Sequence, residues 1–437
     1  MLSLTEVTAG GVGIIIGAGI YVLIGAATAT AGPSVWISFI LAAVLCAFTG
    51  LSYAELAARF PSAAAEYTYT QQVFPRWVAF ITGWVMIFGL IIAAATVALG
   101  FANYLSLSVP ALGGRIGAAL LIVAVAALAL RGIKQSARLT LALSVIQIGG
   151  LLFVIVIGIP HIGEQPLLTS SVGQDGGPSV ATGVFGAAAL VFFAFIGFDE
   201  VATLAEETRD PARTVPRALF LALDISTLLY VGVAIAAVSV LGAPALGASP
   251  RPLADVVAHV LGDRSAAAVA AIALVSTTNT SLLALTSASR VIFGMARDTA
   301  LPRVLADVRA QSGAPMPAIA LAALIALGFV MVGDLKLIAG VADFAVYAVF
   351  IAVNATVVVL RLRDGTREVE TFRVRGTIAG VPVLPLLGTA AVLVMLTHLE
   401  PVVLLIGALL LGAGAVAAVL RHMQHRATRH NTGPPAT

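Results

Sequence analysis

Charged residues are scarce in this chain. Asp, Glu, Lys and Arg make up 10% of its 437 residues, whereas hydrophobic residues make up 60%. An ordinary soluble domain carries about 25% charged residues, so this sequence lacks the polar groups to cover a water-facing surface of its size. Its apolar residues form long runs that recur too often for a single peripheral anchor. The composition therefore predicts a polytopic membrane protein.

Cysteine is almost absent as well. Cys46 is the only one and lies in an apolar run, which excludes disulfides and thiolate metal sites within the chain. The histidines are scattered, and the sequence contains no phosphate-binding loop, zinc-ligand spacing or nucleophile triad. We therefore expect no catalytic residue, no metal and no cofactor, and we do not expect an enzyme. A cleaved signal peptide is not expected either, because the first apolar run starts almost at Met1 without a basic segment.

The apolar runs predict the number of membrane spans. About 20 apolar residues cross the hydrocarbon core of a bilayer as a helix. By this measure we expect twelve spans, which are Thr8–Ala31, Val35–Leu56, Trp77–Leu105, Ile116–Leu130, Leu139–Ile159, Val180–Ala205, Pro216–Leu241, Ala266–Phe293, Pro317–Val332, Leu337–Leu360, Ile378–Leu396 and Pro401–Leu420.

The positions of Lys and Arg predict the orientation. Of the 24 such residues, only Arg115, Arg251, Arg264 and Lys336 fall in one set of loops, and the others lie in or beside the opposite set and the tail. Cytoplasmic loops carry the excess of positive charge, so we expect both termini in the cytoplasm and a location in the cell (cytoplasmic) membrane. We therefore attribute the net charge of +3 to the excess of Lys and Arg in cytoplasmic loops. We expect membrane lipid and no nucleic acid as a partner.

The first span contains more glycine than a plain membrane helix tolerates. Five of residues 10–21 are glycine, and each glycine inside a helix costs roughly 0.5–1 kcal/mol relative to alanine. Irregular backbone at membrane depth is tolerated where it lines a cavity and offers N–H and C=O groups to a solute. We interpret Gly17-Ala18-Gly19 as an unwound binding turn. The alternative is that these glycines only let helices pack closely.

A second interruption is expected in the sixth span, at Phe193-Ala194-Phe195-Ile196-Gly197-Phe198-Asp199-Glu200. Both runs lie in the first span of a unit of five, and an odd number of spans inverts the second unit relative to the first. Paired interrupted spans of this kind point to a transporter site. The predicted organisation is a first inverted repeat at residues 1–160, a second at 178–361, two further spans at 362–420 and a cytoplasmic tail at 421–437.

Several longer motifs occur in order along nearly the whole chain. They are Gly11-Val12-Gly13-Ile14-Ile15-Ile16-Gly17-Ala18-Gly19-Ile20-Tyr21, Tyr53-Ala54-Glu55-Leu56, Gly197-Phe198-Asp199, Glu206-Glu207-Thr208-Arg209-Asp210-Pro211 and Arg290-Val291-Ile292-Phe293-Gly294-Met295-Ala296-Arg297-Asp298. With these motifs the sequence resembles the amino acid–polyamine–organocation (APC) transporter superfamily, and within it the bacterial relatives of cationic amino acid transporters.

The resemblance implies the leucine-transporter-like fold. This is an all-α polytopic protein with two inverted repeats of five helices, broken helices 1 and 6, and two C-terminal helices. The implied function is a secondary active transporter, or permease, that moves amino acids by alternating access. A polyamine or other organic amine transporter or exchanger is the alternative.

The resemblance also implies a substrate site at the two breaks, with half-helix dipoles to reinforce it. The first break would hold the substrate carboxylate on N–H groups, and carbonyls of both breaks would hold the amino group. Phe195 and Phe198 are candidates for an aromatic gate, with simple core packing as the alternative. The implied substrate-binding residues are Ile15, Gly17, Ala18, Gly19, Phe193, Ala194, Phe195 and Ile196.

Further residues are candidates for gating or coupling: Asp199, Glu200, Gln147, Thr277, Asn279, Thr280 and Phe198. Asp199 and Glu200 project about 100° apart, so only one of them readily faces the pathway; Asp199 can equally cap freed N–H groups. Thr277, Asn279 and Thr280 belong to a polar run that lines the pathway or joins helices.

Coupling is left open by one departure from the family pattern. Proton-coupled relatives carry a lysine where this chain has Gln147, and glutamine cannot titrate, although it can bond carbonyls of the first span. Proton symport through such a lysine is therefore not expected, whereas exchange, facilitated uptake and protonation at Asp199 or Glu200 all stay open, as does the oligomeric state.

Overall fold

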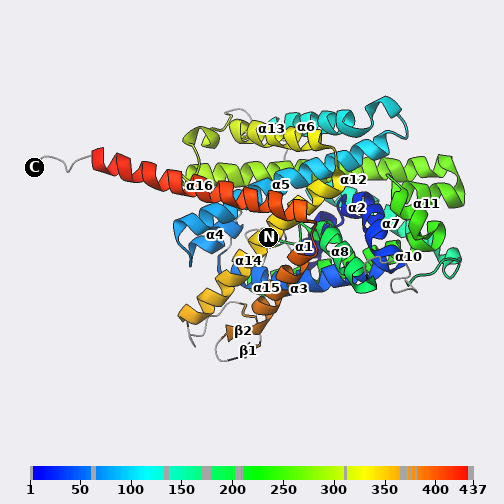
Figure 1. Cartoon of the computed structure of the whole chain (residues 1–437), viewed down its shortest axis with the longest axis horizontal. Helices are drawn as coiled ribbons and strands as arrows, with labels where there is room; N and C mark the ends of the chain where they lie inside the picture. Colours follow the sequence, from blue (N-terminus) through cyan, green and yellow to red (C-terminus); the bar gives the residue numbers. More distant parts are fainter. Residues whose placement is uncertain are drawn as a thin grey trace, which may run out of the picture.

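The computed structural model describes residues 3–60, 65–131, 137–168, 179–199, 201, 208, 210–309, 313–364, 372–374, 376–378 and 381–431. Within these ranges the chain consists of helices and one short antiparallel pair of strands, β1 (Thr377–Ile378) and β2 (Val381–Pro382) (Figure 1). The α-helices are α1 (Leu4–Ile15), α2 (Gly19–Ala31), α3 (Val35–Arg59), α4 (Ala65–Gln71), α5 (Arg76–Leu105), α6 (Gly114–Leu130), α7 (Ala137–Gly158), α8 (Val180–Val191), α10 (Pro211–Ala248), α11 (Pro252–Leu261), α12 (Asp263–Arg297), α13 (Met316–Val332), α14 (Leu335–Asp364), α15 (Val383–Thr397) and α16 (Pro401–Asn431).

Many of these helices suit a bilayer. Among the described residues, seven helical stretches are long and apolar enough to cross one, namely Gly19–Arg59, Arg76–Leu105, Ala142–His161, Arg213–Ala248, Asp263–Arg297, Leu335–Arg363 and Pro401–Arg421. Shorter apolar helices, such as Leu4–Ile15 and Val180–Phe195, accompany them. The chain is therefore an all-α polytopic protein in the described ranges apart from the strand pair, and the count of twelve spans stays a prediction.

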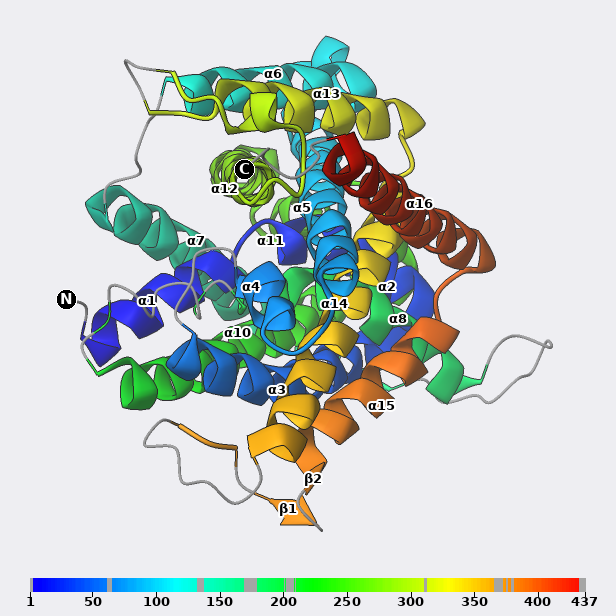
Figure 2. The same cartoon turned by 90° about the vertical axis from the view of Figure 1, so that its left-hand side faces the viewer.

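Helix α5 is the most buried of the seven bilayer-length stretches and lies inside the bundle. α5 packs along α12 and α14, while α10 packs against α1, α2 and α3. Figure 2 shows α6 and α13 side by side at one edge, with α15 and the strands at the opposite edge. Small residues allow this close packing: a Cβ on Gly100 of α5 would lie 2.2 Å from a methyl carbon of Val22 on α2.

The first span is interrupted at Ile16–Ala18. α1 starts with a capping box, in which the Ser3 hydroxyl accepts the N–H of Glu6 and the Glu6 carboxylate accepts the N–H of Ser3. It ends at Ile15, because Ile16 takes a ψ of 61° that a helix cannot continue, and α2 begins at Gly19. The interruption thus lies in the glycine cluster, where the sequence predicts it.

The second interruption follows α8. Helix α8 passes into a 3-10 turn, η4 (Phe192–Phe195), after which Ile196 is extended and Gly197 adopts a φ of +111°. This φ favours glycine. The two interruptions touch: a Cβ on Gly19 would lie 2.4 Å from the Cα of Ala194, and one on Gly197 would lie 2.9 Å from Ile14. The absence of side chains at Gly19 and Gly197 therefore allows two segments that are almost 180 residues apart in the sequence to lie in contact.

Candidate functional site

A small cavity lies between the two interruptions. Its volume is about 60 Å³, which is room for a few water molecules. Among the described residues its lining carries no Asp, Glu, Lys or Arg. The lining consists of Ile14, Ile15, Gly17, Ala18, Gly19, Leu90, Ala93, Val97, Phe193, Ala194, Ile196, Gly197, Thr280, Leu283 and Ala284. Of the residues implied to bind substrate, all but Phe195 line this cavity.

The N–H groups at the first interruption are partly engaged within the protein. Ala18 donates its N–H to the hydroxyl oxygen of Thr280 over 3.0 Å, and Gly17 donates to the carbonyl of Ile15 over 2.7 Å. Gly19 opens α2, where the first N–H groups of a helix have no acceptor within the helix. Thr280 reaches the turn because Gly17 has no side chain: a Cβ there would lie 2.6 Å from its hydroxyl oxygen.

The carbonyl groups of the two interruptions meet at Tyr230. The hydroxyl of this α10 residue lies 2.6 Å from the carbonyl oxygen of Ile15 and 2.9 Å from that of Ala194. A phenol has one hydrogen, so it serves one carbonyl at a time or is shared between them. The carbonyl of Phe193 accepts from Ile196 over 3.2 Å. Tyr230 is completely buried and packs edge-on against Phe195, with ring centroids 5.2 Å apart.

Tyr230 is the residue that sequence reasoning missed. The available signal was a tyrosine in the middle of the expected span Pro216–Leu241. A phenol at membrane depth needs a hydrogen-bond partner, and an interrupted helix offers carbonyls that have lost theirs.

The side chain of Gln147 makes no hydrogen bond to the described residues of the first span, and its role in coupling stays a prediction. Its side chain is completely buried, and within the described residues neither amide atom has a hydrogen-bond partner. Instead, its backbone carbonyl accepts from the hydroxyl of Tyr21 over 3.3 Å. Helices α7 and α1 approach each other closely at Gly13, where an added Cβ would lie 1.8 Å from the hydroxyl oxygen of Ser144.

Asp199 acts as a cap at the second interruption. Its carboxylate accepts the N–H of Gly197 over 3.0 Å, and its side chain is buried. Phe198 points away from the cavity into an aromatic cluster, edge-on to Tyr53 at 5.9 Å and to Phe350 at 5.3 Å. Glu200 lies outside the described residues, so its role stays a prediction.

The polar run on α12 divides its contacts. Thr280 faces the cavity, Thr277 donates to the carbonyl of Ala273 within its own helix, and Ser281 donates to the carbonyl of Ala94 on α5. Asn279 is buried without lining the cavity. Thr280 therefore lines the cavity and Ser281 links α12 to α5, while a role of the run in a transport pathway stays a prediction.

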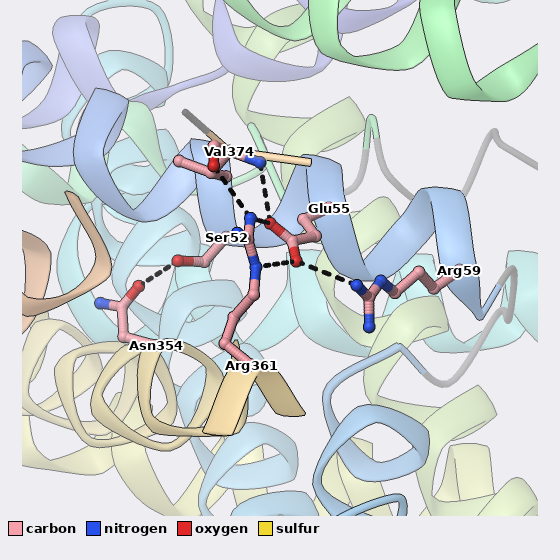
Figure 3. Close-up of polar contacts among 6 residues, drawn as sticks. All are labelled: Ser52, Glu55, Arg59, Asn354, Arg361 and Val374. Carbon is pink, nitrogen blue, oxygen red and sulfur yellow. Dashed lines mark hydrogen bonds and ion pairs between the residues drawn. The ribbon is translucent and has the colours of Figure 1, made fainter. Parts of the chain in front are cut away.

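A second polar cluster joins α3 to α14 (Figure 3). Glu55 is completely buried and accepts two hydrogen bonds from the guanidinium of Arg361, at 2.8 and 2.5 Å. The N–H of Val374 donates to the same carboxylate over 2.9 Å, and Arg59 lies 3.6 Å away. Nearby, the Ser52 hydroxyl donates to Asn354 over 2.6 Å. The charges of this cluster are buried but paired, which is the condition under which buried charges are tolerated.

Apolar helices of bilayer length, with a cavity between two interrupted helices, define a multi-pass membrane protein of the transporter class. The chain belongs to the amino acid permease family of the APC superfamily, and the family pattern matches residues 2–419.

Individual relatives agree with this assignment. The branched-chain amino acid permease BcaP of Bacillus subtilis is 31% identical over 405 residues, which cover 87% of this chain and 84% of that protein. The methylthioribose transporter of the same organism is 29% identical over 446 residues, covering 97% and 94%. The vacuolar cationic amino acid transporter 2 of Arabidopsis thaliana is 31% identical over 387 residues, covering 82% and 59%. These relatives are permeases and transporters, not enzymes.

Proposed function

We propose that this protein is a secondary active permease that moves a neutral, apolar amino acid across the cell membrane by alternating access. The observation that carries the proposal is the cavity between the interruptions, where backbone groups outside regular helix geometry meet a lining that is uncharged among the described residues. An α-amino acid presents a carboxylate and an ammonium group a few ångströms apart. Broken helices supply N–H groups for the first and C=O groups for the second.

The substrate carboxylate binds at the start of α2. The N–H of Gly19 and the positive end of the helix dipole are available there. The N–H of Ala18 joins them when Thr280 releases it, so the hydroxyl of Thr280 holds the place of a carboxylate oxygen in the closed arrangement.

The substrate amino group binds at the carbonyl side. Ile15 and Ala194 supply the carbonyls that Tyr230 now bridges, and Phe193 and Ile196 line the cavity beside them. The cavity of about 60 Å³ is far smaller than the roughly 300–1,000 Å³ of typical ligand pockets. Substrate entry therefore requires the interruptions to separate from α5 or α12.

The uncharged lining favours a neutral substrate side chain. Leu90, Ala93 and Val97 of α5 face Leu283 and Ala284 of α12 across the cavity. A lysine, an arginine or a polyamine would bring a second cation into a site whose described lining has no carboxylate to pair with it. Similarity to a branched-chain amino acid permease supports the same choice.

The proposal includes the membrane topology, which has twelve spans. Two inverted repeats occupy residues 1–160 and 178–361, two further spans lie at 362–420, and a cytoplasmic tail follows at 421–437. Both termini then lie in the cytoplasm. This topology is supported by the distribution of Lys and Arg and by one interruption in the first helix of each repeat.

Cysteine labelling tests the orientation. Cys46 is the only cysteine, so the variant Cys46→Ser gives a cysteine-free protein into which single cysteines can be introduced. An impermeant maleimide added to intact cells should label Asp263→Cys and spare Ser3→Cys; the reverse would overturn the orientation.

Uptake into proteoliposomes tests the function. We expect saturable uptake of leucine or valine that accelerates when the same amino acid is present inside, because a carrier returns faster when loaded. Flux that does not saturate would indicate a channel. Uptake of lysine, putrescine or methylthioribose in place of leucine and valine would overturn the substrate assignment but leave the carrier intact.

A further inference from the structure

Asp343 is a buried carboxylate without a partner. It lies in α14, its side chain is completely buried, and neither oxygen has a hydrogen-bond or ion-pair partner among the described residues. Among the described residues, the other completely buried carboxylate is Glu55, which differs from Asp343 because Arg361 and the N–H of Val374 both bond to it. A buried charge needs pairing, so a lone buried carboxyl must be neutralised in another way.

Asp343 lies where α14 contacts the second interrupted span, which is formed by α8 and η4. It shares one face of α14 with Tyr347, Phe350 and Asn354, at helical spacing. On this face Tyr347 donates to the carbonyl of Ala189 on α8, and Phe350 packs against Phe192 of η4. Asp343 therefore lies at a contact that changes if α8 and η4 move during transport.

Among the described residues, the groups that face Asp343 offer it no positive charge. Asp343 lies close enough to Cys46 of α3 and to Tyr347 to interact with both electrostatically. Cys46 interacts in the same way with Asp199. Helices α8 and α15 and the turn η4 contain no ionisable side chain.

Several other charged groups on the described elements that pack against α14 have their own partners. Lys336 pairs with Glu400 over 2.8 Å, Arg361 pairs with Glu55, and Glu66 of α4 accepts from Tyr53. Arg363 of α14 donates to the carbonyl of Val73, and Arg421 of α16 donates to the carbonyl of Thr299. Arg76 is exposed at the start of α5.

A proton fits this site better than a metal ion. Hard cations such as Ca²⁺ and Mg²⁺ require about six or more oxygen ligands, whereas the described residues contain no group of three or more His, Cys, Asp or Glu that could hold one. The nearby hydroxyl of Tyr347 already donates to Ala189. A proton neutralises a lone carboxylate with no further ligand.

We propose that Asp343 is the proton-binding group of this transporter, a role that rests on the proposed permease function. The closed arrangement excludes water from Asp343 and so holds it as the neutral acid. An opening that admits water to this face of α14 lets it ionise and release the proton to that side. Substrate binding that closes the cavity therefore takes up one proton from the side to which the site was open.

The experiment compares two assays on the same proteoliposomes. In the first, leucine accumulates against its gradient under an inwardly directed proton gradient; in the second, labelled leucine exchanges with unlabelled leucine at equal pH. Relative to wild type, we expect Asp343→Asn to lose about tenfold or more of the accumulation while exchange continues, since coupling is removed without touching the cavity lining. Asp255→Asn, at a partly exposed carboxylate paired with Arg251, is the matched control and should keep both activities.

Each other outcome decides against a defined claim. Accumulation by Asp343→Asn equal to wild type would overturn the assignment of Asp343. Exchange by wild type without accumulation under the proton gradient, or accumulation that needs a sodium gradient, would overturn proton binding. Absence of both activities in wild type for every amino acid tested would instead overturn the permease function.

A conservative variant covers the case in which Asp343→Asn does not fold. Asp343→Glu keeps an ionisable carboxyl and moves it by one methylene. We expect uptake to persist with a displaced pH profile. A profile identical to that of wild type would show that Asp343 is only structural.

Discussion

The hydroxyl oxygen of Thr280 lies 3.0 Å from the backbone nitrogen of Ala18 and accepts its hydrogen bond. One residue belongs to the continuous helix α12 and the other to the interruption between α1 and α2. The bond supplies an acceptor to an N–H group that helical geometry no longer serves. Because a buried, unsatisfied N–H is costly, Thr280 stabilises the interruption.

Thr280→Val tests this relationship because it removes the hydroxyl and keeps the shape of the side chain. We expect the variant to lose about 1–3 kcal/mol of stability, the cost of an unsatisfied buried polar group. The measurement is the melting temperature of the purified protein in detergent. Thr280→Ser, which keeps the hydroxyl, is the control. An unchanged melting temperature in the valine variant would mean that the bond contributes nothing.

Tyr230→Phe removes the hydroxyl that bridges the carbonyls of Ile15 and Ala194. Substrate affinity should fall about three- to tenfold, because the two carbonyls lose the group that orients them toward the amino group. The half-saturation concentration for leucine uptake measures this effect. Tyr104→Phe is a matched control, since that buried hydroxyl donates to the carbonyl of Tyr21 inside α2 and to neither of the two carbonyls that Tyr230 bridges. Equal affinities in both variants would remove Tyr230 from the site.

Both interruptions were predictable from residue type, because glycine marks close approach and unusual backbone. The identity of their neighbours was not. Apolar helices have similar patterns whichever helix they contact, so hydropathy does not reveal that Tyr230 reaches Ile15. The same limit applies to charge: Glu55 and its partner Arg361 are 306 residues apart. Glu55 and Asp343 look alike in the sequence, and only the packing shows that one is paired and the other is not.

Gly19→Ala tests the contact between the two interruptions. The added Cβ would lie 2.4 Å from the Cα of Ala194, so the two segments must separate. We expect leucine uptake to fall at least about tenfold, because a small misplacement of binding groups has a large effect on function. Gly149→Ala is the control, since a Cβ there meets no atom within 4 Å. Uptake that survives Gly19→Ala would show that the segments need not touch.

The ion pair between Glu55 and Arg361 gives the last prediction. Its two hydrogen bonds and the N–H of Val374 join α3, α14 and the segment before β1 (Figure 3). Arg361→Met should cost about 3–5 kcal/mol of stability, because the carboxylate of Glu55 stays buried without its main partner. Lys336→Met breaks an exposed pair with Glu400 and should cost about 1 kcal/mol or less.

The double variant Glu55→Gln with Arg361→Met separates the worth of the pair from the cost of an orphaned charge. Removing both charges relieves the desolvation that each alone would leave, so the double variant should be more stable than Arg361→Met. The melting temperatures of wild type, Glu55→Gln, Arg361→Met and the double variant complete this double-mutant cycle. If the two single losses simply add, then Arg59, 3.6 Å from Glu55, suffices as a counter-charge and Arg361 acts only through packing.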